Sequence, residues 1–296
     1  MPEMMGHDDN TPQITSRRDA LRLMAAGVAG SVLLPQLAQA SRFAAVNAVP
    51  RIERIGMQLY TVRSALAKDI EGTIAAVAKA GITELEFFNM FDKDAAYWRA
   101  LLDKHGLTAP SSHEPLPEKD EWGPVFDRAH AMGHKLLVVP WVAPEARGSR
   151  ANWQRLAERL NIGAAKAKAA GLQFAYHNHD FEFASIDGTT PYEILTTQTD
   201  KDLVKLELDL YWAVKAGQDP LAIMTRWPGR IVAVHVKDAG PAPERKMLEV
   251  GAGTIDFKTI IATGRTQGLR YWFLEHDNPT DAIASITASA AAMKTF

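Results

Sequence analysis

The sequence contains no cysteine among its 296 residues. Disulfide bonds, thiolate metal ligands and a cysteine nucleophile are therefore excluded. Any metal ion must be bound by His, Asp and Glu side chains. A strong charge of either sign is also absent, since 33 Lys and Arg nearly balance 35 Asp and Glu. Because nucleic acid is bound by clustered Lys and Arg, this balance argues against nucleic acid and favours a small-molecule partner.

The amino terminus has the charged, apolar and small-residue parts of an export signal. The pair Arg17 and Arg18 precedes a weakly apolar run, and a small-residue site ends at Ala40. Paired arginines indicate the twin-arginine route, although Ala20 stands where a large apolar residue is usual. The run is too short and too rich in Ala and Gly for a membrane span of about 20 apolar residues.

We therefore expect a periplasmic or secreted protein, exported by the twin-arginine route and free of the membrane after cleavage. Its expected parts are a signal peptide over 1–40, a short linker over 41–51 and one folded domain over 52–296. A cytoplasmic protein with an amphipathic leader is the alternative.

From residue 52 onward, short β-rich runs alternate with amphipathic stretches, which is typical of parallel β/α units. Eight runs are expected to be strands: Ile55–Thr61, Glu84–Phe88, Thr108–Ser112, Lys135–Pro140, Gln173–His177, Val204–Asp209, Ile231–Val236 and Tyr271–Glu275. The helix-like stretches between them include Ile70–Ala80, Tyr97–His105, Val125–Met132, Asn152–Ala170, Leu221–Arg226 and Phe257–Thr266. Glycines that fit left-handed helix caps follow several of them: Gly81, Gly106, Gly133, Gly171 and Gly268.

This pattern predicts an α/β fold with a single (β/α)₈ TIM barrel, which typically takes about 250 residues. An open doubly wound sheet is the alternative. Such a sheet has a glycine-rich phosphate loop after its first strand, and the residues from Gln58 to Arg63 do not form one.

Polar residues close the last four expected strands, at the barrel end where active sites lie. Because side chains i and i+2 of a strand share a face, four pairs are expected to point together: His177/His179, Glu207/Asp209, His235/Lys237 and Glu275/Asp277. Imidazoles and carboxylates buried together are costly unless they are paired or bind a cation. The pairs therefore predict one divalent metal ion, and ligands without sulfur leave Mn, Mg, Co and Zn open. Taken alone, the two histidines after the fifth strand are equally consistent with loop histidines bonded to backbone carbonyls.

The chain from Ile55 to its end resembles the xylose-isomerase-like TIM barrels, which include sugar phosphate isomerases and epimerases, inosose dehydratases and related keto-sugar enzymes. The motifs that carry the resemblance are Gln58-Leu59-Tyr60-Thr61-Val62-Arg63, Ser111-Ser112-His113, Tyr176-His177-Asn178-His179-Asp180-Phe181-Glu182-Phe183, Leu208-Asp209-Leu210-Tyr211-Trp212, Val234-His235-Val236-Lys237-Asp238 and Leu274-Glu275.

The resemblance implies that one divalent ion is bound by Asp209, His235 and Glu275. The family's remaining ligand, a Glu after the fifth strand, is replaced here by His177. Either His177 or Glu182 then supplies the fourth ligand, and we prefer His177 because it stands at the strand end.

A divalent ion that bridges a sugar carbonyl and hydroxyl favours proton abstraction through an enediolate. The expected catalytic residues are Glu182, Glu275, His179 and Lys237. Lys237 is expected to polarise a substrate oxygen or, alternatively, to form a salt bridge with Asp238 or Glu207. The expected substrate-binding residues are Gln58, Tyr60, His113, Trp141 and Trp212, of which the Trp side chains are candidates to stack on a sugar ring.

Three functions follow from these residues. The first is a metal-dependent isomerase or epimerase acting on a non-phosphorylated sugar or keto-sugar, since no Arg and Lys cluster for a phosphate is evident. The second is a lyase or dehydratase that acts by β-elimination on a 3-keto-glycoside or an inosose-like substrate. The third is a non-catalytic periplasmic carbohydrate-binding barrel. Each takes a small sugar as partner, and a homo-oligomer is left open.

Overall fold

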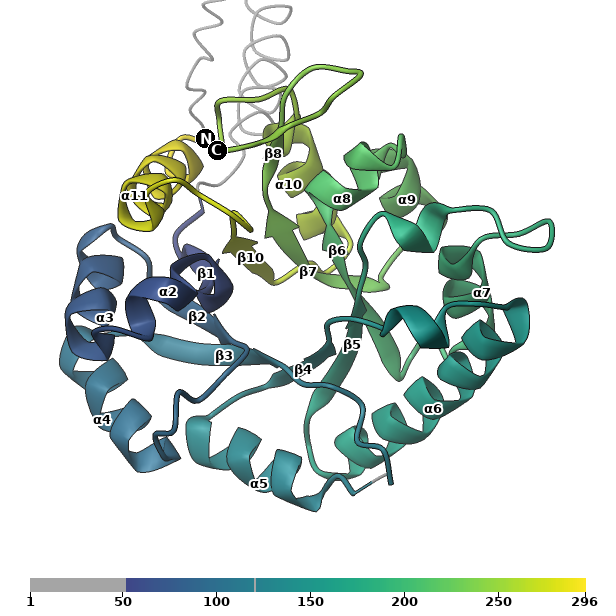
Figure 1. Ribbon diagram of the computed structural model, residues 1–296, viewed down its shortest axis with the longest axis horizontal. Helices are drawn as coiled ribbons and strands as arrows, with labels where there is room; N and C mark the ends of the chain where they lie inside the picture. The colour runs from purple at the N-terminus through teal and green to yellow at the C-terminus, as the bar shows by residue number, and fades with distance from the viewer. Residues whose placement is uncertain (1–51, 120) are drawn as a thin grey trace, which may run out of the picture. The chain divides into compact units, whose positions relative to one another are not determined.

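The computed structural model describes residues 52–119 and 121–296 of the chain. Within this part, eight parallel strands form a closed barrel in the order β1-β10-β7-β6-β5-β4-β3-β2 (Figure 1). The barrel strands are β1 (Gly56–Gln58), β2 (Glu84–Phe87), β3 (Thr108–His113), β4 (Leu136–Val139), β5 (Gln173–His177), β6 (Val204–Asp209), β7 (Ile231–Val236) and β10 (Tyr271–Leu274). The predicted (β/α)₈ barrel and its eight strands are confirmed, except that the first strand, expected to reach Thr61, ends at Gln58 and continues as a 3₁₀ helix. The expected signal peptide and linker lie outside the described residues.

Helices surround the barrel on its outer face (Figure 1). The α-helices are α2 (Arg63–Leu66), α3 (Ile70–Lys79), α4 (Ala95–His105), α5 (Gly123–Met132), α6 (Arg150–Ala169), α7 (Pro191–Gln198), α8 (Leu210–Lys215), α9 (Pro220–Arg226), α10 (Phe257–Thr266) and α11 (Ala282–Met293). Short 3₁₀ helices are η1 (Leu59–Val62), η2 (Pro144–Ala146) and η3 (Phe181–Phe183). The sequence pattern did not single out α7, α8 or α11, because α7 and α8 are short and α11 is Ala-rich with little contrast between its faces.

The glycines expected after helices have the predicted backbone conformation. All five have φ between 66° and 90°, in the left-handed region. Glycine adopts this region without the clash that a Cβ atom causes, so each one ends its helix and turns the chain toward the next strand.

An apolar layer closes the barrel beneath the polar strand ends. Leu136, Ala175, Ala233 and Phe273 pack together inside the barrel and are fully buried. The last three lie two residues before His177, His235 and Glu275, so they share the inward face with these polar side chains. Within the described part of the chain, this apolar layer therefore shields the polar layer from water on its lower side.

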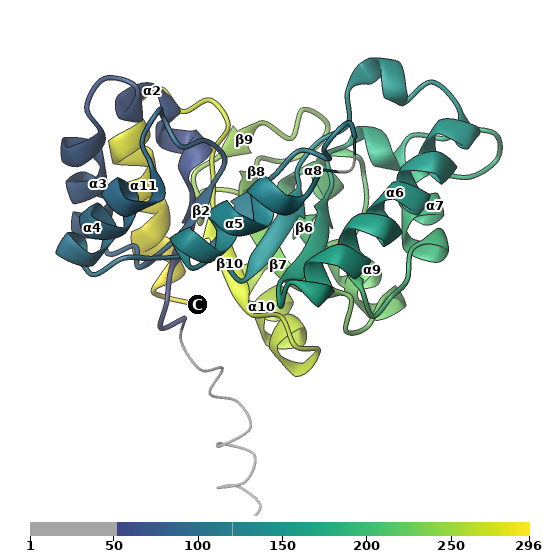
Figure 2. The same ribbon diagram turned by 90° about the horizontal axis from the view of Figure 1, so that it is seen from below.

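A small antiparallel pair, β8 (Asp238–Ala239) and β9 (Met247–Leu248), follows β7. In the side view of Figure 2, β8, β9 and α8 lie toward one end of the barrel and α10 lies toward the other. The Asp238 carboxylate accepts hydrogen bonds from the backbone N–H groups of Ala239, Gly251 and Gly253. These bonds fix the long loop after β7 beside the strand ends. Across residues 52–119 and 121–296, no helix has both the length and the apolar character needed to cross a membrane.

Candidate active site

A buried cluster of carboxylates and imidazoles occupies the carboxyl end of the barrel. Its side chains come from β2, β3, β5, β6, β7 and the residue after β10: Glu86, His113, His177, Glu207, Asp209, His235 and Glu275. The contacts divide the cluster into two groups. We call Asp209, His235 and Glu275 the upper group, and Glu86, His113 and Glu207 the lower group.

In the upper group, Asp209, His235 and Glu275 each offer one ligand atom, and these atoms lie within 4.8 Å of one another. His235 Nδ1 is 2.7 Å from Glu275 Oε2 and 3.9 Å from Asp209 Oδ2. His177 Nε2 lies at the edge of this group, 3.7 Å from Asp209 Oδ2. The structure thus brings together the three residues expected to bind an ion and places the preferred fourth residue beside them.

Asp209 is oriented by the turn from β6 into α8. Its Oδ1 accepts a hydrogen bond from the backbone N–H of Trp212 at 2.9 Å and so caps α8. Its own backbone N–H donates to Asn178 Oδ1 at 3.1 Å, which ties the ends of β5 and β6 together. Its Oδ2 is buried and makes no hydrogen bond among the described residues, but it forms an ion pair with Lys237 Nζ at 2.9 Å. Burial raises the pKa of Asp209 to about 6. Lys237 offsets part of this cost of burial, and a metal cation at Oδ2 would offset more of it.

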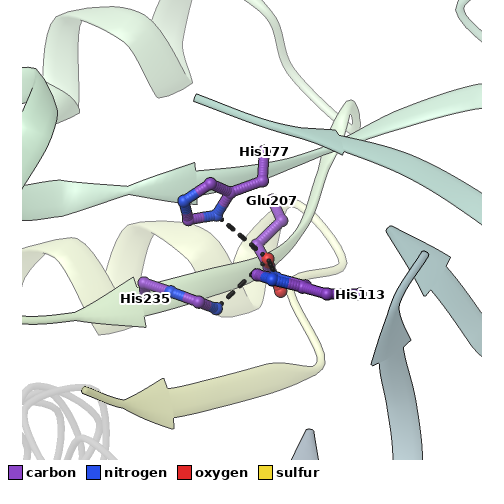
Figure 3. A group of neighbouring side chains, drawn as sticks. All are labelled: His113, His177, Glu207 and His235. Carbon is purple, nitrogen blue, oxygen red and sulfur yellow. Dashed lines mark hydrogen bonds and ion pairs between the residues drawn. The ribbon is translucent and has the colours of Figure 1, made fainter. Parts of the chain in front are cut away.

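In the lower group, three imidazoles surround one oxygen of Glu207 (Figure 3). Glu207 Oε2 lies 2.9 Å from His113 Nε2, 3.1 Å from His177 Nδ1 and 3.2 Å from His235 Nε2. Burial and the neighbouring Glu86 raise the pKa of Glu207, but the surrounding imidazoles outweigh them and hold it at about 2. Glu207 is therefore an ionised hydrogen-bond acceptor at neutral pH.

Glu86 extends the lower group toward β1 and β3. Its Oε1 lies 2.7 Å from His235 Nε2 and accepts a hydrogen bond from Gln58 Nε2 at 2.8 Å, while Ser111 Oγ donates to Oε2 at 2.6 Å. The pKa of Glu86 is lowered by His113 and His235, which outweigh its burial. Conversely, Glu86 and Glu207 raise the pKa of His113 to about 9 against the effect of burial.

His177 and His235 each link the two groups through their two ring nitrogens. His177 directs Nδ1 to Glu207 and Nε2 toward Asp209, whereas His235 directs Nε2 to Glu86 and Glu207 and Nδ1 toward the upper group. A neutral imidazole has one N–H and one lone pair. If His177 Nδ1 and His235 Nε2 each donate to a carboxylate of the lower group, then His177 Nε2 and His235 Nδ1 each have a lone pair for a cation. Histidine ligands of metals typically have such a carboxylate partner, so these residues fit a divalent ion at the upper group.

Lys237 adds a fixed positive charge beside the upper group. Its Nζ lies 2.9 Å from Asp209 Oδ2, 2.7 Å from Glu275 Oε2 and 2.6 Å from Asp277 Oδ1. The alternative salt bridges expected with Asp238 or Glu207 are therefore not the ones it forms. Burial lowers the pKa of Lys237, but these three carboxylates outweigh it and raise the pKa well above its ordinary value. Because Asp277 is an additional partner, Lys237 keeps an ion pair when the upper group binds an ion.

A cavity of about 590 Å³ opens above the cluster. Of the expected substrate-binding residues, Tyr60, His113 and Trp141 line it, as do His177, His179, Lys237 and Glu275. Trp212 is not among the lining residues and packs beside His179, with ring centroids 5.6 Å apart. Gln58 is fully buried, because η1 begins at Leu59 and the Gln58 side chain accepts the Tyr60 N–H. Gln58 therefore supports Glu86 and does not reach the cavity.

Glu182 lies outside the cluster. Its carboxylate accepts hydrogen bonds from Tyr176 Oη at 2.7 Å and from the backbone N–H of His179 at 2.8 Å, and it does not line the cavity. Burial raises its pKa to about 7. This geometry favours His177 as the fourth ligand and gives Glu182 the task of fixing the backbone at His179.

His179 forms part of the cavity wall as a neutral imidazole. Burial, followed by the charge of Lys237, lowers its pKa to about 3. Its ring stacks on Phe181 with centroids 5.5 Å apart, and its Nδ1 has no hydrogen-bond partner among the described residues. His179 is therefore neutral at neutral pH, and its Nδ1 is available for a hydrogen bond to a ligand.

Glu86 was not among the residues expected from the sequence, although the sequence carries a signal for it. In the strand Glu84–Phe87, glutamate alternates with apolar residues, and this alternation places Glu86 on the face opposite Leu85 and Phe87. The apolar lining residues Phe88, Pro115 and Pro140 were also missed, because single apolar residues after strands carry no sequence signal that separates lining from packing.

Comparisons with known proteins agree with this fold. A family model described as xylose isomerase-like TIM barrel matches residues 74–295. An inosose dehydratase from Lacticaseibacillus casei is 28% identical over 251 residues, which cover 71% of this chain and 83% of the relative. A solved structure of a sugar phosphate isomerase/epimerase from Parabacteroides distasonis ATCC 8503 is 25% identical with a TM-score of 0.71, covering 84% of this chain and 96% of that one. The IolI protein, solved with a bound zinc atom, is 16% identical with a TM-score of 0.57, covering 81% and 96%, and is thus similar in fold.

Proposed function

Because the chain belongs to the xylose isomerase-like TIM barrel family, we propose that it is a metal-dependent lyase acting on a non-phosphorylated keto-sugar. The proposed reaction removes the proton next to the carbonyl and expels an oxygen substituent from the β-carbon. The 28% identity to an inosose dehydratase supports a lyase of this kind. From the sequence, isomerisation or epimerisation was the first expectation and the lyase the second. The lyase is now the preferred reaction.

The preference for a lyase over an isomerase rests on one observation. Glu275 Oε2 and Lys237 Nζ lie 2.7 Å apart, and both residues line the cavity. A carboxylate and an ammonium side by side can act on the same face of a bound sugar. β-Elimination on one face needs this combination, a base for the α-proton and an acid for the departing oxygen.

Asp209, His235, Glu275 and His177 are the residues that would hold the divalent ion. Asp209 Oδ2, His177 Nε2 and His235 Nδ1 lie close together and support this assignment, although Lys237 Nζ is also 2.9 Å from the Asp209 oxygen. When bound, a divalent ion supplies a Lewis acid that polarises the substrate carbonyl and stabilises negative charge on its oxygen. Mn, Mg, Co and Zn all remain consistent with this set of nitrogen and oxygen ligands.

The proton balance uses only residues of the chain. The α C–H bond breaks and its proton passes to Glu275, a double bond forms between the α- and β-carbons, and the β C–O bond breaks. Lys237 donates a proton to the departing oxygen, and a proton transfer from Glu275 to Lys237 over their 2.7 Å contact restores both groups. No oxidant or reductant is consumed.

The cavity favours a substrate without phosphate. Lys237 is the one Lys or Arg among the described residues that line it, and three carboxylates already neutralise its charge. A phosphate dianion would lie near Glu275 and Asp277 without a free cation to bind it. Neutral hydroxyl groups can instead bond to His113, His179 and Asp277.

Isomerisation or epimerisation is the second candidate. Its support is the 25% identity to the isomerase/epimerase of known structure. Within the site, His179 follows β5 and Glu275 follows β10, which are separated in the barrel by β6 and β7. A neutral imidazole on one wall and a carboxylate on another could exchange protons on opposite faces of a sugar carbon.

Turnover in deuterated water separates these outcomes. The metal-loaded protein is incubated with non-phosphorylated keto-cyclitols, 3-keto-glucosides and free ketoses, and NMR follows both carbon-bound deuterium and the released fragment. We expect release of water or alcohol with formation of an unsaturated ketone. Deuterium exchange with an isomeric product and no release would instead establish the isomerase, and neither exchange nor release with any of them would refute the proposed function.

We also propose that the protein acts outside the cytoplasm. The support is the pair Arg17 and Arg18 with the apolar run and the small-residue site at Ala40. We expect the wild-type chain in the periplasmic fraction with Ser41 as its first residue. Replacing both arginines by lysine is expected to leave the uncleaved precursor in the cytoplasm, as seen by fractionation and mass spectrometry. An uncleaved wild-type chain in the cytoplasm would contradict export.

A further inference from the structure

The wall of the cavity is divided into two chemically different halves. Residues that follow β1, β2, β3 and β4 make an apolar half: Tyr60, Phe88, Pro115, Pro140 and Trp141. Residues at or after the ends of β5, β7 and β10 make a polar half: His177, His179, Lys237, Glu275, Asp277 and Asn278. His113 is the one imidazole on the β1–β4 side of the lining. The reacting groups of the proposed lyase therefore occupy one half of a larger cavity.

The apolar half exposes two large aromatic rings to solvent. Tyr60 is 39% exposed and Trp141 is 49% exposed, and Ile162 is the third exposed large hydrophobic residue in the described part of the chain. Two of these three side chains thus lie at the mouth of one cavity. Exposed apolar groups gathered at one place commonly mark a ligand-binding surface.

The Tyr60 ring is held in place from behind. The Arg63 guanidinium lies 4.0 Å from the centre of the ring, and Arg63 Nη1 donates to the carbonyl oxygens of Tyr60 and Asp277. Phe88 packs edge-on against the same ring at a centroid distance of 5.3 Å. Since Arg63 covers one face, the ring can offer its other face to a ligand without losing conformational freedom on binding.

Trp141 is supported in a similar way. The Arg147 guanidinium lies between aromatic rings, 3.3 Å from the centre of Phe181 and 4.8 Å from the centre of Trp141. Arg147 Nε donates to the carbonyl oxygen of Val142 at 2.6 Å, which fixes the guanidinium. Each exposed ring at the mouth is therefore backed by an anchored arginine.

We infer that the apolar half is a subsite for a second ring carried by the substrate on its departing oxygen. This inference rests on the proposed function, which leaves the departing group open. A cavity of about 590 Å³ falls within the range of about 300–1,000 Å³ typical of sites for ligands larger than one sugar. The class of substrate is a keto-sugar glycoside, and elimination converts it into an unsaturated keto-sugar and a free alcohol or phenol. Both aryl rings and the C–H faces of sugars stack on aromatic side chains.

Calorimetry with ligands that do not react tests the subsite apart from the chemistry. The probes are 4-nitrophenyl β-glucoside and cellobiose, each carrying a second ring, and glucose, which has none. We expect Trp141→Ala and Tyr60→Ala each to weaken binding of the two-ring probes about tenfold, which corresponds to about 1.4 kcal/mol, and to leave glucose binding unchanged. Ile162→Ala, which removes an equally exposed apolar side chain on α6, is expected to change nothing.

The two probes also identify the ring that the subsite prefers. A loss for the aryl glucoside alone assigns the subsite to aromatic alcohols, and a loss for cellobiose alone assigns it to a second sugar. Unchanged binding of both probes to both variants would overturn the subsite. Turnover of 3-keto-glucosides is measured on the same proteins. Absence of turnover together with Trp141-dependent binding would refute the proposed reaction and leave the subsite standing.

Discussion

Replacing Asp209 by asparagine is expected to remove the bound divalent ion and to lower kcat by about a thousandfold. Asp209 Oδ2 is buried, forms an ion pair with Lys237 Nζ at 2.9 Å, and faces His177 Nε2 and His235 Nδ1. Asparagine keeps the volume and an oxygen that can cap α8, but it removes the negative charge. The loss of several kcal/mol of charge stabilisation in the transition state corresponds to about three factors of ten in rate.

The ion content of the purified variant is measured by elemental analysis after removal and readdition of metal, and far-UV circular dichroism checks the fold. Asp277→Asn is the matched control, because Asp277 also contacts Lys237, at 2.6 Å, and lies outside the upper group. It is expected to retain the ion. Full retention of the ion in Asp209→Asn, together with the same result for His235→Ala, would refute the upper group as the metal site.

The barrel was predictable because its signals are local and repeated. Each strand is a short β-rich run, and glycines such as Gly106 and Gly133 adopt the positive φ that ends the preceding helix. The closure of β1 against β10 depends on contacts far apart in the chain, yet it follows once eight such units are counted. Helix α11 was missed because small residues occupy both faces, with Ser285, Ser289 and Ala290 among its buried residues and alanine at most of its exposed positions.

The site was predictable only where strand alternation decides the geometry. Asp209, His235 and Glu275 meet because each lies within one residue of the end of its strand, on the inward face. The role of Gln58 was not predictable, because a 3₁₀ turn at Leu59 redirects its side chain toward Glu86. The partners of Lys237 were not predictable either, since they lie on β6 and after β10 and are set by the width of the barrel.

The division of the cluster into an upper and a lower group could not be predicted from the sequence, for a similar reason. Glu207 and Asp209 share one face of β6 and were expected to act together, but they differ in height along the barrel axis. Glu207 therefore meets the lower nitrogens of His177 and His235, and Asp209 meets the side that faces the cavity. Although they are only two residues apart on β6, Asp209 is expected to bind the ion and Glu207 is expected to orient the histidines that bind it.

Replacing Glu207 by glutamine is expected to weaken binding of the divalent ion by about 10- to 100-fold, the usual effect of losing a carboxylate that orients metal-binding histidines. Glu207 lies 3.1 Å from His177 Nδ1 and 3.2 Å from His235 Nε2. An ionised carboxylate only accepts hydrogen bonds. Glu207 therefore favours the tautomers in which His177 Nδ1 and His235 Nε2 carry the proton and the other nitrogen of each ring has a lone pair. A glutamine amide also donates, and its NH₂ group can stabilise the opposite tautomer of His177, in which Nε2 carries the proton and cannot bind an ion.

Titration of the metal-free variant with Co²⁺, followed by its visible absorption, measures both the affinity and the ligand geometry. Glu207→Asp, which keeps the charge, is expected to recover part of the affinity. Glu182→Gln is the matched control, because Glu182 is an equally buried carboxylate that contacts Tyr176 and the His179 backbone, and it is expected to keep wild-type affinity. A loss of the ion in Glu182→Gln would instead make Glu182 the fourth ligand.

Complete loss of the ion in Glu207→Gln with retention in Asp209→Asn would place the ion among His113, His177, Glu207 and His235, whose ligand atoms also lie within 4.8 Å of one another. Comparing the Glu207 and Asp209 variants therefore distinguishes an ion in the upper group from an ion beside Glu207. The comparison works because the two carboxylates contact different nitrogens of the same imidazoles, those of His177 and His235.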